Sequence, residues 1–185
     1  MSLHGQGTDS LLIITGGMGA GKSSVLAEAS DILWLRHLSH AAIDLDMLGL
    51  GCLPLGAETH EVMYENLRSV SRNYAAAGVQ RFLVARCLED RAQLDLCREI
   101  FSPRNTVVCR ITASLGVMQG RVQRRESGIS RQEYIHRVTV LSEILDRVRL
   151  EDFAVVNENR HITDVASEML VKAGWISAGP HSLAD

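Results

Sequence analysis

Residues 16–23 combine residue types and a spacing that point directly to one chemistry. They are Gly-Gly-Met-Gly-Ala-Gly-Lys-Ser and fit the pattern G-x-x-x-x-G-K-[ST]. Glycines let the backbone curl so that consecutive N–H groups point into one concavity that suits an anion. The lysine is a compact cation that can reach phosphate oxygens, and the serine hydroxyl can bind Mg²⁺. The stretch therefore predicts a loop that binds nucleotide phosphates.

The segments on either side supply the elements that such a loop needs. Residues 11–15 are a short apolar run typical of a buried strand, and a helix is expected over about 21–35. The positive N-terminal end of that helix would face the same anion. A glycine-rich turn that opens a helix by coincidence is the alternative. The expected nucleotide contacts are Gly16, Gly17, Met18, Gly19, Ala20, Gly21, Lys22, Ser23 and Ser24.

Two carboxylates come after the next predicted strand, residues 41–43. Asp44 and Asp46 lie at its carboxyl end, which is where ligands bind in a parallel sheet. Residues two apart in an extended segment face the same way, so both side chains should project toward the phosphate loop. Like charges side by side repel each other unless Mg²⁺, a substrate or a proton intervenes. The alternative is two solvated loop residues, or one of them as a helix cap.

The third predicted strand, residues 79–85, lacks the acidic residue that often comes after it and helps to hold Mg²⁺ in phosphate-loop proteins. Arg86 comes next instead. The metal role therefore falls more heavily on Ser23 and Asp44. Arg86 should lie at the mouth of the site, where it either faces a substrate or forms a structural ion pair.

Arginines gather around a short connector, residues 126–129, between two predicted helices. Guanidinium groups offer forked donors that suit phosphate, although a solvated charged turn is the alternative. Arg68 and Arg72, one turn apart on a helix expected over 58–77, leave the same choice between an anionic acceptor and solvent. The four arginines around the connector are Arg121, Arg124, Arg125 and Arg131.

Composition limits the classes of partner. The net charge of −3 gives no reason to expect nucleic acid or an anionic membrane. Only two of the 19 basic residues are lysines, so a lysine within the loop is harder to attribute to chance. The cysteines form no C-x-x-C pair, and buried free thiols in a reducing cytosol are expected. These cysteines are Cys52, Cys87, Cys97 and Cys109.

The whole chain is organised as alternating strands and helices. The alternation occurs five times, which favours a parallel sheet covered on both faces. We expect a flexible segment at 1–10, one domain over 11–175 and a tail at 176–185. No apolar run approaches 18 residues and no signal peptide is recognisable, so we expect a cytoplasmic protein without a membrane partner, as a monomer or homodimer.

These features resemble the small P-loop kinases related to nucleoside monophosphate kinases, shikimate kinase, gluconate kinase and adenylylsulfate kinase. The resemblance covers about residues 11–174 and rests on the loop at 16–23, on Asp44-x-Asp46 and on Arg121-x-x-x-Arg125. It implies a three-layer α/β P-loop NTPase fold with five parallel strands in the order 2-3-1-4-5. It also implies helices on both faces and a short mobile lid over ATP.

The resemblance also implies roles for individual residues. In shikimate kinase-like members the first Asp after strand two assists Mg²⁺ and the second takes the proton of the acceptor hydroxyl, which implies these roles for Asp44 and Asp46. Arg121 would pack on adenine. Arg125, or its neighbour Arg124, would contact the transferring phosphates.

The activity implied is ATP-dependent. Lys22, Asp46 and Arg125 would be catalytic, and Ser23 and Asp44 would hold Mg²⁺. The chain would move the γ-phosphate of ATP–Mg²⁺ to a hydroxyl of a small metabolite that the sequence does not identify. The alternative is a nucleotide-binding module or slow regulatory ATPase, which the missing strand-three carboxylate favours.

Overall fold

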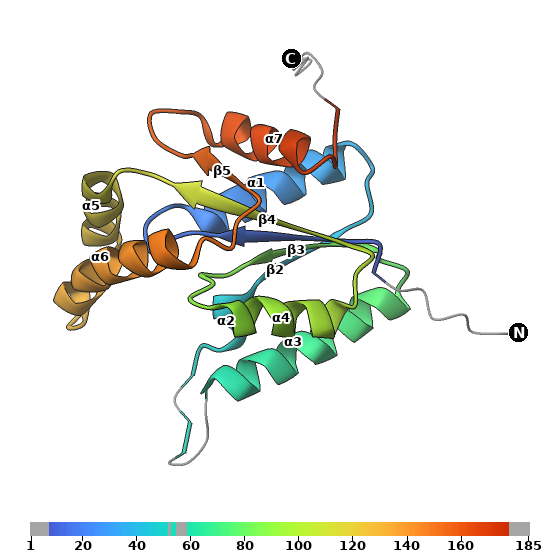
Figure 1. Cartoon of the computed structure of the whole chain (residues 1–185), viewed down its shortest axis with the longest axis horizontal. Coiled ribbons are helices and arrows are strands. Elements are labelled where there is room, and N and C mark those ends of the chain that lie inside the picture. The colour runs from blue at the N-terminus through green and yellow to red at the C-terminus, as the bar shows by residue number, and fades with distance from the viewer. Residues whose placement is uncertain (1–7, 52, 55–58, 178–185) are drawn as a thin grey trace, which may run out of the picture.

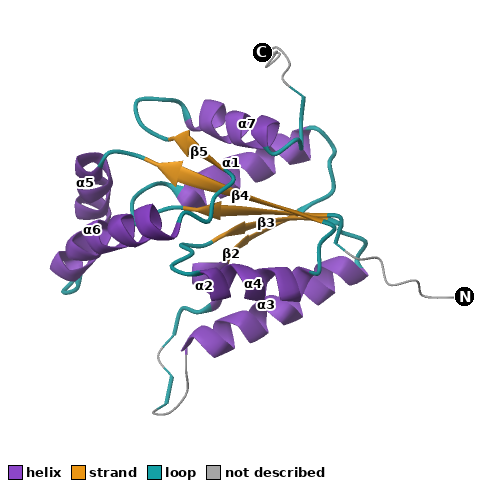
Figure 2. Ribbon diagram, viewed as in Figure 1, coloured by secondary structure: helices purple, strands orange, loops and turns teal. Residues whose placement is uncertain are grey.

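The computed structural model describes residues 8–51, 53–54 and 59–177. Its five strands form one parallel sheet in the order β2-β3-β1-β4-β5, which confirms the predicted order. Figure 2 shows the strands as a layer between groups of helices. The apolar runs of the sequence supply the strands, as expected for a sheet that is buried on both faces. They are β1 (Ser10–Thr15), β2 (Ala41–Asp44), β3 (Arg81–Ala85), β4 (Asn105–Thr112) and β5 (Phe153–Val156).

Helices cover both faces of this sheet and one of its ends (Figure 1). In Figure 1, α1 and α7 lie above the sheet and α2, α3 and α4 lie below it, while α5 and α6 gather where the strand arrows end. The helices are α1 (Lys22–Leu35), α2 (Leu45–Leu48), α3 (Thr59–Ala76), α4 (Arg91–Phe101), α5 (Leu115–Arg125), α6 (Arg131–Val148) and α7 (Ile162–Lys172).

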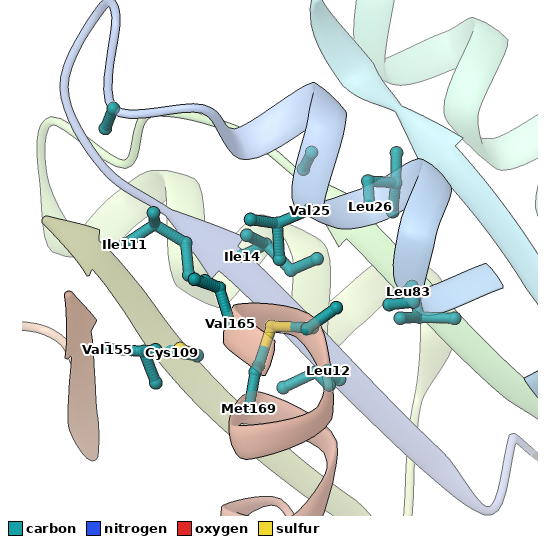
Figure 3. Packing of buried hydrophobic residues seen from close by; sticks show 14 of the residues in the cluster. Leu12, Ile14, Val25, Leu26, Leu83, Cys109, Ile111, Val155, Val165 and Met169 are labelled. Atoms are coloured by element: carbon teal, nitrogen blue, oxygen red, sulfur yellow. The ribbon is translucent and has the colours of Figure 1, made fainter. Parts of the chain in front are cut away.

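The central strand β1 divides its side chains between two cores. Leu12 and Ile14 pack in the core formed with α1 and α7, and Leu11 and Ile13 pack in the core formed with α3 and α4. Side chains alternate between the two faces of a strand, so a strand covered on both sides must be apolar throughout. Figure 3 shows Leu12 and Ile14 among side chains of α1, β4 and α7. This packing fixes the strand from which the phosphate loop starts.

The strand register brings the carboxyl ends of β2, β3 and β1 to one level. Asp44 of β2 is paired with Ala85 of β3, and Ala85 is paired with Ile14 of β1. The phosphate loop, the chain after β3 and the short helix α2 all start from this edge. Residues far apart in the sequence therefore meet there.

The expected boundaries differ from the structure at the N-terminal side. The prediction of a flexible segment up to residue 10 is wrong for residues 8–10. Thr8 is buried, Asp9 donates its backbone N–H to Gln80 at 2.9 Å, and β1 starts at Ser10. The rest of that segment, Cys52, and residues 178–185 of the expected tail lie outside the described residues. In the described part of the chain, no helix combines the length and apolarity needed to cross a membrane.

Candidate active site

The predicted phosphate loop joins β1 to α1 and needs glycine for two separate reasons. Gly16, Gly19 and Gly21 have φ angles of +150°, +81° and +100°, which side chains other than glycine rarely adopt. There is also no space for a side chain at two of these positions. A Cβ at Gly16 would lie 2.5 Å from the carbonyl oxygen of Ile111, and one at Gly19 would overlap the backbone oxygen of Met118. The loop can therefore approach its neighbours only as bare backbone.

The first turn of α1 directs its N–H groups toward the space in front of the loop. Gly21 precedes the helix in a left-handed conformation and makes no side-chain cap. The first N–H groups of a helix have no partner within the helix, and with the helix dipole they favour an anion. Lys22 starts the helix and its Nζ donates to the backbone oxygen of Gly17 at 3.3 Å. Cation, helix end and loop backbone thus lie together.

Arg121 of α5 and Asn157, just after β5, hold the loop from outside. Arg121 donates to the backbone oxygens of Gly19 at 3.2 Å and Ala20 at 3.3 Å, and also to that of Asn157 at 2.8 Å. Asn157 donates its side-chain N–H to Ala20 at 2.8 Å. The resemblance implies that Arg121 packs on adenine, but here its guanidinium bonds to the loop backbone, so an adenine contact stays a prediction.

A cavity of about 500 Å³ lies in front of the loop. It is bounded by the loop and α1 on one side, by residues after β2 and β3 and the start of α3 on another, and by α5 and α6. Its lining residues are Met18, Gly19, Gly21, Lys22, Ser23, Ser24, Asp46, His60, Arg86, Cys87, Glu89, Arg121, Val122, Arg125, Arg137 and Leu141. Gly16, Gly17 and Ala20, also expected to contact the nucleotide, are not among them, and Ala20 packs in the core.

Ser23 and Asp44 are in direct contact. The Ser23 hydroxyl donates to Oδ2 of Asp44 at 2.5 Å, and Oδ1 of Asp44 accepts the N–H of Asp46 at 3.2 Å. Asp44 thus also caps α2, one of the alternatives that the sequence leaves open. A hydroxyl and a carboxylate oxygen suit Mg²⁺, which usually takes one or two protein ligands and fills its octahedron with waters and phosphates. No described group of three or more His, Cys, Asp or Glu side chains could cage a metal alone.

This pairing predicts a specific metal phenotype. Asp44→Asn should raise the Mg²⁺ concentration needed for ATP binding by about tenfold, because losing one anionic ligand weakens Mg²⁺ binding by roughly 1–2 kcal/mol. ADP binding without metal should change much less. Calorimetric titrations at several Mg²⁺ concentrations measure both quantities. An unchanged Mg²⁺ dependence would show that Asp44 serves only as the cap of α2.

Asp46 reaches the cavity by a route other than the one predicted. The expectation of an extended segment is wrong: Asp46 lies in the first turn of α2, which begins immediately after Asp44. The cap by Asp44 turns the backbone out of the strand, so the two carboxylates are not related by strand alternation. Asp46 nevertheless lines the cavity together with Lys22 and Ser23.

Arg86 forms the ion pair that was one of the two expected roles, and its contact with a substrate stays a prediction. It forms an ion pair with Asp46, and its Nη2 lies 2.9 Å from Nε2 of His60. It also lines the cavity. Cys87 is the next residue in the wall, and burial raises the pKa of this thiol, so it stays protonated at neutral pH.

The arginines around the α5–α6 connector separate into two sets. Arg125 lines the cavity and pairs with Glu126 at 2.7 Å, whereas Arg124 and Arg131 are not among the lining residues. Arg137 of α6 lines the cavity. On α3, Arg68 pairs with two glutamates and Arg72 is exposed, and neither of them lines this cavity.

Several lining or supporting residues were not predicted. They are His60, Glu89, Arg137 and Asn157. Asn157 had a usable signal, because it comes directly after β5 at the carboxyl edge where ligand sites form. Arg137 pairs with Glu89 at 3.2 Å, a contact between residues 48 positions apart that no local pattern indicates.

No protein-family model and no curated protein matches the sequence of this chain. Solved structures do match its fold. A gluconokinase from Sinorhizobium meliloti has a TM-score of 0.58 and 18% identity, over 91% of this chain and 93% of that one. The tunicamycin resistance protein of Deinococcus radiodurans has a TM-score of 0.61 and 17% identity, over 93% and 99%.

A third similar structure holds two bound ligands. The APS kinase of Mycobacterium tuberculosis, in complex with AMPPNP and APS, has a TM-score of 0.59 and 19% identity, over 91% of this chain and 99% of that one. Identities this low establish the architecture alone. The sheet order, the helices on both faces and these similarities show that this chain has the fold of the small P-loop kinases.

Proposed function

We propose that this chain is an ATP-dependent phosphotransferase that moves the γ-phosphate of ATP to a hydroxyl group of a small metabolite. The observation that carries the proposal is that Lys22, Ser23 and Asp46 line one cavity. A phosphate cradle and a carboxylate for a hydroxyl proton are the two parts that such a transfer needs. The similar folds of a gluconokinase and an APS kinase support the same class of reaction.

The residues divide the work of the transfer between them. Loop N–H groups and Lys22 bind the phosphates and orient the γ-phosphate toward Asp46. Ser23 and Asp44 would hold Mg²⁺, which supplies charge neutralisation on the phosphate oxygens when it is bound. Asp46 accepts the proton of the acceptor hydroxyl as that oxygen attacks, and Arg125 stabilises negative charge on the transferring group.

The cavity defines the acceptor only in outline. About 500 Å³ has to accommodate the phosphates and the acceptor together, which limits the acceptor to a small molecule. The acceptor end is lined by Asp46, His60 and Arg86. These side chains can donate to or accept from hydroxyl groups.

A screen of metabolite pools tests the proposal. The wild-type protein is incubated with ATP, Mg²⁺ and fractionated metabolites, and mass spectrometry compares the phosphorylated products with those of Lys22→Ala. The proposal predicts at least one product that requires both ATP and Lys22. ATP binding without any such product would instead support a nucleotide-binding module.

The binding module or slow regulatory ATPase remains the second candidate because of one observation. β3 ends at Ala85 and Arg86 comes next, so the carboxylate that often assists Mg²⁺ at this position is missing. The two candidates differ in their requirement for Asp46. A module that only binds nucleotide does not need a carboxylate beyond the phosphates, and its ATP turnover would be insensitive to Asp46→Asn.

A further inference from the structure

The side chain of Arg86 makes more contacts than a single ion pair would. Its backbone N–H bonds to Ile14 of β1 at 3.0 Å, which fixes the residue at the carboxyl edge of the sheet. From there its side chain, only 11% exposed, reaches α2 and α3 at once. It pairs with Asp46 on α2 and with His60 on α3. One guanidinium thus joins two elements that line the cavity.

We propose that Arg86 is a positioning residue: it holds the Asp46 carboxylate and the His60 imidazole in place at the acceptor end of the cavity. The inference rests on the proposed phosphotransferase function, because Asp46 has a catalytic task only there. Arg86 acts through Asp46 and takes no proton itself, since a guanidinium stays charged at every physiological pH.

Asp46 needs such support because the helix that carries it, α2, is too short to hold the side chain in one position. α2 has four residues, and half of the Asp46 side chain is exposed. Among the described residues, Arg86 is the hydrogen-bond partner of the Asp46 carboxylate, and it donates to Oδ1. A carboxylate on so short a helix would otherwise sample several rotamers, and a misplacement of about 1 Å can lower a rate by about 10²-fold. With Oδ1 engaged, Oδ2 is available for an acceptor hydroxyl.

The contact with His60 fixes which ring nitrogen carries the proton. A guanidinium is only a donor, so Nε2 of His60, 2.9 Å from Nη2 of Arg86, must be the acceptor. In this hydrogen bond the ring proton of His60 therefore lies on Nδ1. Arg86 thereby sets the hydrogen-bonding pattern that a second cavity-lining residue presents to the acceptor.

The energetics of Arg86 also favour a functional role. Its Nε is buried and has no partner among the described residues, and a buried N–H without a partner is destabilising. An ion pair whose carboxylate is half-exposed contributes little to the free energy of unfolding. Stability alone therefore does not explain a guanidinium here.

A double-mutant cycle separates positioning from a purely structural role. The variants are Arg86→Met, Asp46→Asn and the double variant, with turnover of ATP–Mg²⁺ measured in the presence of the metabolite pool and ATP affinity measured separately. Arg86→Met should lower turnover by about 10²-fold. ATP affinity should stay within about twofold, because the phosphate contacts are made elsewhere. Arg86→Lys, which keeps a cation for Asp46, should recover part of the loss.

Arg110 provides a matched control. Its side chain is 13% exposed, close to the 11% of Arg86, and it pairs with Asp146 and Glu151 away from this cavity. Whatever its effect on the melting temperature, Arg110→Met should leave the turnover of the folded protein close to that of the wild type. Equal losses of turnover in the two variants would overturn the positioning role.

The double-mutant cycle and an NMR spectrum distinguish failure of the inference from failure of the proposed function. If Arg86 acts through Asp46, the double variant is no slower than the slower single variant. Losses that multiply would overturn the inference while the phosphotransferase proposal stands. If the wild type neither binds ATP nor phosphorylates a metabolite, the proposed function itself fails. In ¹⁵N-histidine NMR spectra, assigned with His60→Gln, His60 should carry its proton on Nδ1, and a proton on Nε2 would contradict the arrangement.

Discussion

Asp46→Asn should lower phosphoryl transfer to the acceptor by about 10² to 10⁴-fold while ATP affinity stays close to that of the wild type. The amide keeps the shape of the carboxylate but cannot take the proton of the attacking hydroxyl. Phosphate binding should persist because Lys22 and the loop N–H groups, not Asp46, hold the phosphates. Steady-state kinetics with the acceptor found in the screen, together with calorimetry for ATP, measure the two effects separately.

A second aspartate serves as the control for this substitution. Asp95 on α4 pairs with Arg98 at 3.4 Å and does not line the cavity. Asp95→Asn removes the same charge and should leave the transfer rate unchanged. A transfer rate in Asp46→Asn within a few-fold of the wild type would mean that Asp46 is only the ionic partner of Arg86.

Gly19→Ala should both destabilise the protein and abolish most ATP binding. Gly19 has a φ of +81°, and any other residue in this left-handed conformation would destabilise the folded protein by roughly 1–2 kcal/mol. The new Cβ would also overlap the backbone of Met118, so the loop must move. Losing two N–H bonds to charged phosphate would cost about 3 kcal/mol, which corresponds to about 10²-fold in affinity.

Gly78→Ala separates strain from displacement of the loop. Gly78 has a φ of +89°, but a Cβ there would meet nothing within 4 Å. This control should lower the melting temperature by a few degrees through strain alone and leave ATP affinity intact. Thermal melts and ATP titrations of both variants are the measurements. If Gly19→Ala binds ATP like Gly78→Ala, the close approach to Met118 does not shape the loop.

The fold was predictable because its signals are local. Residues 11–15 and 79–85 are apolar runs whose lengths suit buried strands, and the loop at 16–23 predicts a helix directly after the first strand. Alternation of strands and helices then leaves few arrangements for a parallel sheet. The sheet order itself came from the resemblance, and the structure confirms it.

The site was less predictable because its contacts are long-range. That Ser23 and Asp44 would serve one ion was expected from motif and strand end, and they do touch. The helix at Asp46 was missed, because four residues are too few to show a helical period. The pairing of Arg86 with Asp46 and His60 depends on the register of β2 and β3 and on the packing of α3, which no sequence window contains.

Calorimetric titration of ATP–Mg²⁺ into the wild type, Lys22→Ala and Lys172→Ala tests the central claim most directly. Lys172, the other lysine of the chain, pairs with Glu168 on α7 and does not line the cavity, so its loss controls for the removal of a lysine charge. We expect the wild type and Lys172→Ala to bind equally. Lys22→Ala should bind about 10 to 100-fold more weakly, since a hydrogen bond to a charged group contributes about 1.5–3 kcal/mol. No binding to the wild type, or equal binding by all three proteins, would contradict a phosphate loop at residues 16–23.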